Sequence, residues 1–593
     1  MADTMKGLKR THYCGELRLN HVGEMVTVGG WAQKIRDKGT LVFIDLRDRT
    51  GLVQLTFDEN TAEAVIAKAK SVKPESVLMV QGKVIQREAV NPELETGEIE
   101  ISVTEIRILS LAQTPPFHID GGKVNDDVAL KYRYLDLRRK HLQRNIAMRH
   151  QVAKVAREYF YENGFLEIET PMMMKSTPEG ARDYLVPSRV HNGKFYALPQ
   201  SPQIYKQLLM IAGYDRYIQL ARCFRDEDLR ADRQPEFTQI DLEMSFVDID
   251  DILEVLEGFV HRLFEEVLHV DIPLPLPRLT YADAMNRYGS DKPDTRFGME
   301  IQDISELVKD CGFGVFTSAI ADGGSVRAIV AKNGAKTLTR KAIDKLTEHA
   351  RGIGAKGLAY VRWVDEKPAC SFGKFMAEGE LERILEAIDC KQGDVALIVA
   401  DKNKVTLPVL GALRLTVAKQ LDIVPEGYNF LWITEFPFFE WDEDSQTWVA
   451  MHHPFTMPMD ECLDYLDTDP GKVRAKAYDL VLNGTELSSG SIRITDYELQ
   501  QKMFEALGLT DEEIEAKFGF LVDAYKYGAP PHGGAGIGLD RLSMIMCGAD
   551  SLRDVVAFPK VQNASELMSE CPSPVSAEQL EELGIAVVKA EEE

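Results

Sequence analysis

Long hydrophobic runs are missing from this sequence. No segment approaches the roughly 20 consecutive apolar residues that a membrane-spanning helix needs. The first ten residues, MADTMKGLKR, also lack the apolar stretch of a secretory signal. We therefore expect a cytoplasmic protein that has no membrane partner.

Closely spaced cysteines are also missing. The eight cysteines are scattered, and no two of them form a Cys-x-x-Cys pair. Scattered thiols are typical of reduced cytosolic proteins, whereas structural zinc sites use closely spaced pairs. The sequence predicts no zinc site, no disulfide and no organic cofactor.

An excess of positive charge is absent as well. Against 69 Lys and Arg stand 94 Asp and Glu, which gives a formal charge of −25. Binding of nucleic acid usually requires a basic surface, because phosphates carry negative charge. Unspecific RNA binding is therefore disfavoured, but a specific RNA on a local basic track remains compatible with the sequence.

The length of 593 residues, 45% of them hydrophobic and 27% charged, indicates several globular domains. Changes in composition along the chain suggest where the domains meet. An early stretch of short strands is followed by a proline-containing linker and two stretches rich in chemically active residues, between which lies a segment of small residues. The expected segments are 1–112, 113–140, 141–295, 296–420 and 421–593.

The first segment shows five short alternating stretches, which predict a small closed barrel such as an OB-fold. Strand alternation directs Phe43, Gln54 and Glu100 away from the apolar core. An outward aromatic among polar residues can stack on an unpaired base. Packing of Phe43 under a loop is an equally good interpretation. The five expected strands are 26–31, 40–48, 51–58, 77–87 and 98–109.

Residues 217–244 read as a strand, a charged loop and a second strand. On the second strand Gln239, Asp241 and Glu243 share one face, and Arg225 at the end of the first strand could reach it. Adjacent carboxylates are costly unless they meet cations or a ligand. A solvated charged hairpin is the alternative, but the ordered alternation favours a binding face.

A glycine-rich stretch, residues 533–538, runs into an apolar helix that begins with Asp540 and Arg541. Backbone without side chains could let a flat nucleotide lie close, and an arginine at a helix start suits phosphate oxygens. It is not a dinucleotide-binding fingerprint, because no βαβ unit follows it.

Three segments together resemble the signature motifs of class II aminoacyl-tRNA synthetases, in the order of that family. They are Pro171 closing a helix and strand, Phe224-Arg225-Asp226-Glu227, and Gly536-x-Gly538-x-Asp540-Arg541. Four further stretches resemble the bacterial aspartyl branch of the family, and the similarity extends over nearly the whole chain. These stretches are 176–187, 200–207, 452–456 and 490–493.

The resemblance implies an α+β multidomain fold. It has an N-terminal OB-fold barrel that reads the anticodon, an antiparallel catalytic sheet flanked by helices, and an inserted α+β domain. It also implies a homodimer with Pro171 near its interface. The implied activity is a Mg²⁺-dependent activation of L-aspartate with ATP, followed by transfer to the terminal adenosine of tRNA(Asp). Whether tRNA(Asn) is a second acceptor stays open.

The same resemblance implies roles for individual residues. The implied catalytic residues are Arg225, Arg541 and Glu227, and the implied Mg²⁺ ligands are Asp479 and Glu486. Implied ATP contacts are Arg225, Asp226, Glu227, Gln234, Glu486, Gly538, Leu539, Asp540 and Arg541. Implied aspartate contacts are Glu179, Ser201, Gln203, Lys206, Arg225, Asp241, His452 and Arg493. Implied anticodon contacts are Arg36, Phe43, Gln54 and Glu100.

Two departures and several alternatives accompany these expectations. Residues 487–490 replace a more glycine-rich stretch, and Asp540 stands where many class II enzymes carry Glu, as is usual in the aspartyl branch. Taken alone, His452 could be structural and Lys206 a surface lysine. An asparaginyl or lysyl enzyme and an inactive RNA-binding paralogue are the rival functions. In a pocket of Lys206 and Arg493, asparagine is expected to leave both cations unpaired.

Overall fold

The protein folds into two compact units, seen in a computed structural model that describes residues 2–177, 181–227, 233–442 and 446–588. The first unit comprises Met1–Ala147 and Ala549–Pro574, and the second comprises Met148–Gly548 and Val575–Glu593. Among the described residues, no helix combines the length and apolar character needed to cross a membrane. The eight cysteines are free thiols.

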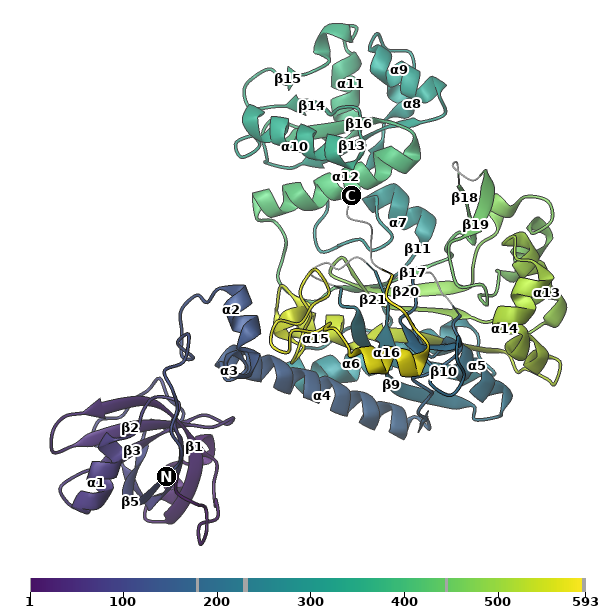
Figure 1. Ribbon diagram of the computed structural model, residues 1–593. Helices are drawn as coiled ribbons and strands as arrows, with labels where there is room; N and C mark the ends of the chain where they lie inside the picture. Colours follow the sequence, from purple (N-terminus) through teal and green to yellow (C-terminus); the bar gives the residue numbers. More distant parts are fainter. Residues whose placement is uncertain (1, 178–180, 228–232, 443–445, 589–593) are drawn as a thin grey trace. The chain divides into compact units, whose positions relative to one another are not determined.

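A closed five-stranded barrel forms most of the first unit (Figure 1), as the alternation predicted. Its strand order is β1-β2-β3-β5-β4, with α1 (Glu63–Lys70) between β3 and β4. The side chains of Val42, Ile44 and Leu46 are fully buried inside it. The strands are β1 (Met25–Asp37), β2 (Val42–Arg47), β3 (Leu52–Phe57), β4 (Val77–Gln86) and β5 (Ile99–Ser110).

Strand β1 is longer than the sequence predicted. It continues from Trp31 to Asp37 and pairs with β2 across a bulge between Ala32 and Lys34. The extension carries polar residues, so it shows no apolar alternation, and main-chain pairing alone defines it. As a consequence Arg36 lies on a strand, directly opposite Phe43.

The remainder of the first unit holds the segment after the barrel against the segment 549–574. Arg133 is buried and donates hydrogen bonds to the carbonyl oxygens of Arg553, Val556 and Ala557. The helices here are α2 (Asp126–Lys131), α3 (Arg133–Asp136), the start of α4 (Lys140–Glu162), and the 3₁₀ helices η1 (Cys14–Glu16), η2 (Leu19–His21) and η6 (Leu552–Asp554).

An eight-stranded sheet is the centre of the second unit, in the order β11-β17-β20-β21-β22-β10-β9-β6. All neighbours are antiparallel except the edge pairs β11–β17 and β9–β6, so the predicted antiparallel sheet is confirmed. The strands are β6 (Leu166–Glu167), β9 (Arg216–Phe224), β10 (Glu236–Ser245), β11 (Arg278–Thr280), β17 (Phe430–Thr434), β20 (Ala477–Leu482), β21 (Thr485–Ile492) and β22 (His532–Gly538).

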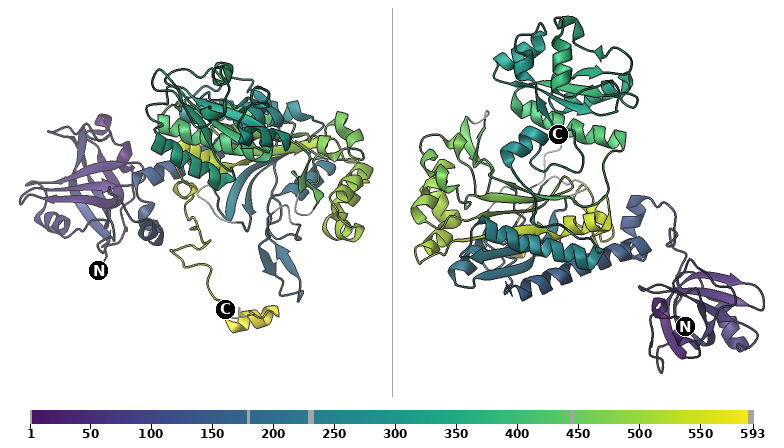
Figure 2. Two further views of the ribbon diagram at one scale, coloured as in Figure 1. Left: turned by 90° about the horizontal axis from the view of Figure 1, so that it is seen from above. Right: turned by 180° about the vertical axis from the view of Figure 1, so that it is seen from behind.

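Helices α4, α6 (Ile249–Leu268) and α15 (Leu539–Cys547) pack on one face of this sheet and form its main core. The long helices α4 and α6 run side by side across that face (Figures 1 and 2), where Phe160 contacts Phe259. The side chains of Ile252, Leu256 and Leu263 of α6 are fully buried there. Helix α5 (Gln203–Ile211) contacts β9 and β10, from which the polar residues of β10 project.

The segment of small residues forms a second sheet, ordered β12-β13-β16-β14-β15, with an apolar core on each face. Where α7 (Tyr281–Tyr288) ends, Gly289 has a φ of +69°, and an added Cβ would lie 2.1 Å from the carbonyl oxygen of Leu407 in α12. Glycine is therefore required for this close approach. The strands are β12 (Gln302–Asp303), β13 (Ser325–Ala331), β14 (Ala359–Arg362), β15 (Ala369–Cys370) and β16 (Val395–Asp401); the helices are α8 (Ser305–Val308), α9 (Gly314–Ala321), α10 (Arg340–Ile353), α11 (Glu380–Ala387), α12 (Asn403–Leu421) and η3 (Gly373–Phe375).

Smaller elements complete the second unit. Two hairpins flank the central sheet, β7–β8 and β18–β19. Their strands are β7 (Leu185–Pro187), β8 (Phe195–Ala197), β18 (Phe439–Asp442) and β19 (Thr447–Ala450). The remaining helices are α13 (Tyr497–Ala506), α14 (Asp511–Tyr525), α16 (Ala577–Leu583), η4 (Asp460–Tyr465) and η5 (Pro470–Lys472).

Candidate active site

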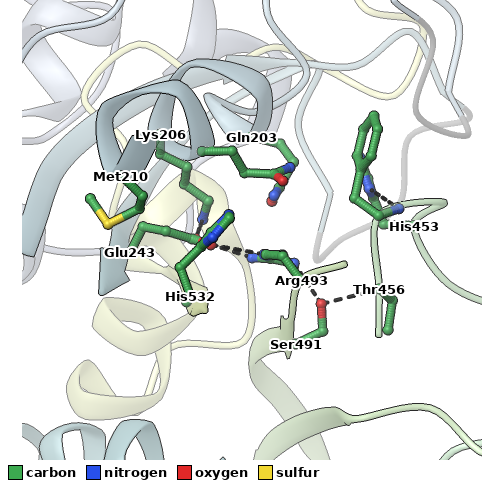
Figure 3. A network of polar contacts seen from close by, with 12 residues as sticks. Gln203, Lys206, Met210, Glu243, His453, Thr456, Ser491, Arg493 and His532 are labelled. Carbon is green, nitrogen blue, oxygen red and sulfur yellow. Dashed lines mark hydrogen bonds and ion pairs between the residues drawn. The ribbon is translucent and has the colours of Figure 1, made fainter. Parts of the chain in front are cut away.

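A buried network of charged residues lies on the polar side of the central sheet (Figure 3). Strand β10 supplies Asp241 and Glu243, helix α5 supplies Lys206, and Arg493 follows the end of β21. The side chains of these four residues are at most 5% exposed. Charged groups are buried this deeply only when they are paired or bind a ligand.

The two cations of the network share one carboxylate. Lys206 Nζ lies 2.9 Å from Asp241 Oδ1 and 3.2 Å from Glu243 Oε2. Arg493 donates from Nε to Glu243 Oε1 over 2.9 Å and from Nη2 to Oε2 over 3.2 Å. Arg493 Nη1 also donates to Ser491 Oγ over 2.6 Å. Glu243 is thus the centre of the network.

Burial and ion pairing act differently on the two carboxylates. Burial raises the pKa of Asp241 to about 6, although Lys206 lowers it. Burial would also raise the pKa of Glu243, but Arg493 and Lys206 outweigh it and bring that pKa to about 2. Glu243 is therefore a permanent anion near neutral pH, whereas Asp241 titrates close to neutrality.

Asp241 Oδ2 and Gln203 Nε2 are among the buried polar atoms beside this network that have no hydrogen-bond partner among the described residues. One is an acceptor and the other a donor. A ligand that carries both an ammonium and a carboxylate group would satisfy them. Ser201 Oγ accepts from the main-chain N–H of Gln203 over 3.4 Å, which places Ser201 at the same helix start. Glu179 lies outside the described residues.

The ring of His452 contacts an aromatic residue, Phe436. Its ring packs edge-on against Phe436 at 5.0 Å, and its buried Nε2 has no hydrogen-bond partner among the described residues. Burial lowers the pKa of His452 to about 4. The imidazole is therefore neutral and available as a hydrogen-bond donor or acceptor. The neighbouring His453 accepts from the Phe455 main chain through Nδ1 at 3.3 Å.

Arg225 follows the last residue of β9. Its guanidinium lies 5.1 Å from the ring of Phe237, and its buried Nε finds no acceptor in the part of the chain that the structure describes. A buried guanidinium N–H without an acceptor suits an anionic ligand. Next to it, Asp226 pairs with Arg182 at 3.3 Å and Glu227 with Arg233 at 2.6 Å. Gln234 is buried before β10 begins.

The first residues of helix α15 are held by contacts with neighbouring segments. Asp540 is occupied on both oxygens, by Arg149 and by the main-chain N–H of Thr238 at 3.0 Å. Leu539 belongs to the apolar core. The side chains of Asp540 and Leu539 thus hold α15 in place. Arg541 donates to the carbonyl oxygen of Glu486 over 3.2 Å.

The glycines of strand β22 leave space for side chains of the neighbouring strand β10. A Cβ added at Gly534 would lie 2.1 Å from Glu243 Oε2, and one added at Gly536 would lie 3.2 Å from Gln239. At these two positions side chains of β10 occupy the space that a Cβ would take. At Gly538 the nearest atom would be 3.7 Å away, which leaves more room.

Asp479 on β20 and Glu486 on β21 form a pair of acidic residues. Asp479 is buried, and its Oδ1 has no hydrogen-bond partner among the described residues. Burial raises the pKa of Asp479 well above its usual value, and the charge of Glu486 raises it further. A divalent cation would relieve both effects. No group of three candidate metal ligands occurs among the described residues, so such an ion would complete its shell with ligand phosphates and water.

In the first unit, Arg36, Phe43, Gln54 and Glu100 lie together on the outside of the barrel. Arg36 donates to Gln54 Oε1 over 2.9 Å, and Gln54 donates to Glu100 over 2.5 Å. The guanidinium of Arg36 lies 5.8 Å from the Phe43 ring. Gln54 is only 7% exposed, less than its outward direction predicted, because these neighbours cover it. The half-buried Phe43 remains accessible.

Sequence reasoning missed three residues that shape the site. Glu243 was placed on the polar face of β10 but was given no role, although its alternation with Asp241 was the available signal. Arg149, which holds Asp540, and His532, at the start of β22, gave no sequence signal at all. Burial lowers the pKa of His532, so this imidazole adds no charge beside Glu243 near neutral pH.

Comparison with known proteins agrees with this geometry. A family model for class II tRNA synthetases (D, K and N) matches residues 125–562, and one for an OB-fold nucleic acid binding domain matches residues 26–109. An aspartate–tRNA ligase of Ruminiclostridium cellulolyticum is 59% identical over 99% of this chain and 100% of its own. An aspartate–tRNA(Asp/Asn) ligase of Lachnoclostridium phytofermentans is 58% identical over 99% of both chains.

A solved structure supports the fold. An asparaginyl-tRNA synthetase from Pyrococcus horikoshii, complexed with asparaginyl-adenylate, superposes with a TM-score of 0.59 at 19% identity, covering 93% of this chain and 98% of that one. At this identity the likeness concerns the fold alone. Taken with the full-length relatives and the family models, it leads to one assignment: the chain belongs to the class II tRNA synthetases, in the branch of the aspartate–tRNA ligases.

Proposed function

We propose that this enzyme activates L-aspartate with ATP and then esterifies it to the terminal adenosine of tRNA(Asp). The observation that carries the proposal is the buried set of Lys206, Arg493, Asp241 and Glu243, which suits a zwitterion with an additional carboxylate. Arg225, whose Nε lacks an acceptor among the described residues, supports binding of the phosphate that is attacked.

In the first step an oxygen of the substrate α-carboxylate attacks the α-phosphorus, and the bond to pyrophosphate breaks. In the second step a ribose hydroxyl of the tRNA attacks the acyl carbon, and AMP leaves. Arg225 and Arg541 would orient the phosphate and neutralise the charge that develops on it. Asp479 and Glu486 would hold Mg²⁺, which would supply further charge neutralisation to the phosphates. No zinc or organic cofactor enters the scheme.

Selection of aspartate over asparagine has a different basis from the one expected. In the free enzyme, Lys206 and Arg493 are already paired with Asp241 and Glu243, so asparagine would not leave bare cations. Lys206 already meets Asp241, Glu243 and the carbonyl oxygen of Leu242, so the N–H groups left for a ligand are those of Arg493. They are donors, and an amide NH₂ directed at them has no acceptor to offer. We expect kcat/KM for aspartate to exceed that for asparagine by about 10⁴-fold, the size typical of such a polar mismatch.

Amino-acid-dependent ATP/pyrophosphate exchange tests the proposal. Aspartate is expected to support exchange, while asparagine and lysine at equal concentration are expected to support almost none. Removal of Mg²⁺ with a chelator is expected to abolish exchange. Comparable exchange with asparagine would contradict the assignment of the pocket, and absence of exchange with aspartate would contradict the proposed activity.

We further propose tRNA(Asn) as a second acceptor, on the ground that relatives 53–58% identical to this chain are named for both tRNAs. Charging assays with each purified tRNA decide this point. The proposal is supported if tRNA(Asn) is charged with aspartate at a rate within tenfold of the rate for tRNA(Asp). A tenfold difference corresponds to about 1.4 kcal/mol. Charging of tRNA(Asp) alone would restrict the enzyme to one acceptor.

A cytoplasmic homodimer is the proposed state of the enzyme. The edge strand β6 leaves one side of the central sheet uncovered. Exposed apolar side chains surround it, namely Tyr161, Leu166, Met172 and Met173, and Pro171 is exposed between them. Edge strands with exposed apolar groups favour self-association. Sedimentation analysis should give twice the mass of 66.6 kDa, and Leu166→Lys with Met173→Lys should lower it to one chain.

Phe43→Ala is expected to raise the KM for tRNA about tenfold while leaving aspartate-dependent exchange unchanged. Stacking of a base on an aromatic ring contributes roughly 1 to 3 kcal/mol, and Phe43 is accessible beside Arg36. Aminoacylation kinetics give the KM, and exchange in the same variant is the control. Equal losses in both assays would show that Phe43 supports the fold instead.

The kcat/KM for aspartate is expected to rise with pH through about 6, the pKa to which burial raises Asp241. Below that pH the carboxyl is protonated and cannot accept the substrate ammonium, so kcat/KM should fall about tenfold per pH unit. Exchange measured between about pH 5 and 8 gives the profile. Asp241→Asn should remove this limb, and a wild-type profile that is flat down to pH 5 would contradict the role of Asp241.

A further inference from the structure

Glu243 has no exposed surface, yet it bonds both cations that the proposed function places around the substrate side chain (Figure 3). Its two oxygens are each used: Oε1 accepts from Arg493 Nε, and Oε2 accepts from Arg493 Nη2 and lies 3.2 Å from Lys206 Nζ. With both oxygens occupied, Glu243 is not itself a contact for the substrate.

The geometry of Arg493 shows what Glu243 does. A guanidinium has five N–H groups. Glu243 takes Nε–H and one N–H of Nη2, and Ser491 takes one N–H of Nη1. Among the described residues no partner is recorded for the other two, one on Nη1 and one on Nη2. These two form the flat edge that binds a carboxylate in a bidentate manner.

The chain makes room for Glu243 at a specific place. Opposite it on β22 stands Gly534, where an added Cβ would lie 2.1 Å from Glu243 Oε2 and 2.1 Å from the main-chain carbonyl oxygen of Leu242. The position of the carboxylate is thus fixed by the backbone of β22 on one side and by two cations on the other.

We propose that Glu243 is a positioning residue that determines amino-acid specificity. It turns the Nη1–Nη2 edge of Arg493 toward the substrate carboxylate and holds Lys206 beside it. The inference rests on the proposed function and adds a residue to it. Because Glu243 fixes direction as well as charge, its loss should weaken aspartate binding.

This proposal is separable from simple charge balance. If Glu243 only reduced the positive charge of the pocket, its replacement by a neutral residue would make the pocket more positive and aspartate would bind more tightly. If it orients Arg493, the same replacement would release the guanidinium, and aspartate would bind more weakly. The two roles therefore predict opposite changes of the KM for aspartate.

Glu243→Gln is the decisive variant, assayed beside the wild type by ATP/pyrophosphate exchange. The KM for aspartate should rise roughly 10- to 100-fold, the size expected for charged hydrogen bonds of about 1.5 to 3 kcal/mol. The KM for ATP should stay near that of the wild type, and the preference for aspartate over asparagine should fall. An unchanged or lower KM for aspartate overturns the proposal. No exchange in the wild type would instead overturn the proposed function.

Glu257→Gln is the matched control, because Glu257 is also a buried glutamate of the second unit, bonded to Trp432 Nε1 at 3.0 Å, but it belongs to α6. Its kinetics should equal those of the wild type. If Glu243→Gln does not fold, Glu243→Asp keeps the negative charge but shortens the side chain, so the carboxylate is drawn back from Arg493. This variant should raise the KM for aspartate as well, and an unchanged KM in the folded variant counts against Glu243.

A second, independent observation concerns helix α10. Within residues 336–356 six Lys or Arg stand against two acidic residues, in a chain whose formal charge is −25. Helix α10 buries Ile343, Leu346 and Ala350 in the core that it shares with α12, so its charged side faces solvent. Arg340 and Arg351 have acidic partners on the same helix. Lys336, Lys341 and Lys345 are exposed and have no ion pair among the described residues.

We propose that this lysine face contacts the phosphate backbone of the bound tRNA, again on the basis of the proposed function. Unpaired lysines attract a polyanion, and each phosphate contact releases counterions. Changing Lys336, Lys341 and Lys345 to Gln together should raise the KM for tRNA about tenfold and make its salt dependence shallower. Aspartate-dependent exchange should not change.

A control variant changes three other exposed lysines to Gln, namely Lys309, Lys367 and Lys374, which lie within residues 296–420 but outside α10. It should keep the KM for tRNA and its salt dependence. If the two triple variants have the same KM for tRNA and the same salt dependence, the proposed RNA contact is overturned. The same result is expected if the α10 face binds another protein instead.

Discussion

Arg225→Ala is expected to lower aspartate-dependent ATP/pyrophosphate exchange about 10³-fold without unfolding the protein. Removal of one preorganised donor from a site of developing charge costs on that order. Arg225 has a buried Nε without an acceptor among the described residues, so its guanidinium makes little contribution to the stability of the free enzyme. The loss should therefore appear in kcat for exchange, with an unchanged circular dichroism spectrum.

Arg222→Ala is the matched control for this variant. Arg222 lies three residues earlier, on β9, but its guanidinium pairs with Glu236 at 2.5 Å and with Thr238 at 3.1 Å. Exchange in Arg222→Ala should remain close to that of the wild type. Exchange near the wild-type level in Arg225→Ala would show that the arginine does not act on the phosphate.

Local periodicity was sufficient to predict most of the fold. The alternation of Val42, Ile44 and Leu46 predicted a barrel strand whose core face is fully buried. The helical spacing of Ile252, Leu256 and Leu263 is typical of an amphipathic helix, and these residues lie on α6. Where main-chain pairing extends into polar sequence, as at Lys34–Asp37 of β1, no side-chain period marks the strand. Strand β6 is only two residues long, because its pairing with β9 ends there.

The site could be predicted in part. Alternation on β10 placed Asp241 and Glu243 on one polar face, and both are buried there. The partners could not be derived from spacing, since Arg493 lies 250 residues away from Glu243 in sequence and Lys206 lies on a helix. Which cation reaches which carboxylate depends on strand register, and register is a property of the folded sheet.

For Gly534, Gly536 and Asp540 as well, the sequence shows the residue but not its neighbours in the fold. The absence of side chains at Gly534 and Gly536 was visible in the sequence, but what fills the space was not. Side chains of the neighbouring strand fill it, because β22 lies directly beside β10. Asp540 was likewise visible as a carboxylate, and only the fold brings Arg149 to it.

Arg493→Met is expected to lower the stability of the second unit by about 3 kcal/mol, because Glu243 then keeps only Lys206 as a cationic partner in a fully buried site. Aspartate-dependent exchange should be lost together with the bidentate edge. The midpoint of the calorimetric transition measures the stability change, followed separately for each transition because a chain of this size does not unfold in one step.

The double variant Glu243→Met with Arg493→Met separates stability from function. It removes both partners of the buried ion pair and leaves Lys206 paired with Asp241 at 2.9 Å. Since replacing a complete buried pair by apolar side chains is often neutral, most of the lost stability should return. Exchange with aspartate should not return, because no guanidinium faces the substrate. A double variant no more stable than Arg493→Met would show that the unpaired carboxylate is not the cause of the destabilisation.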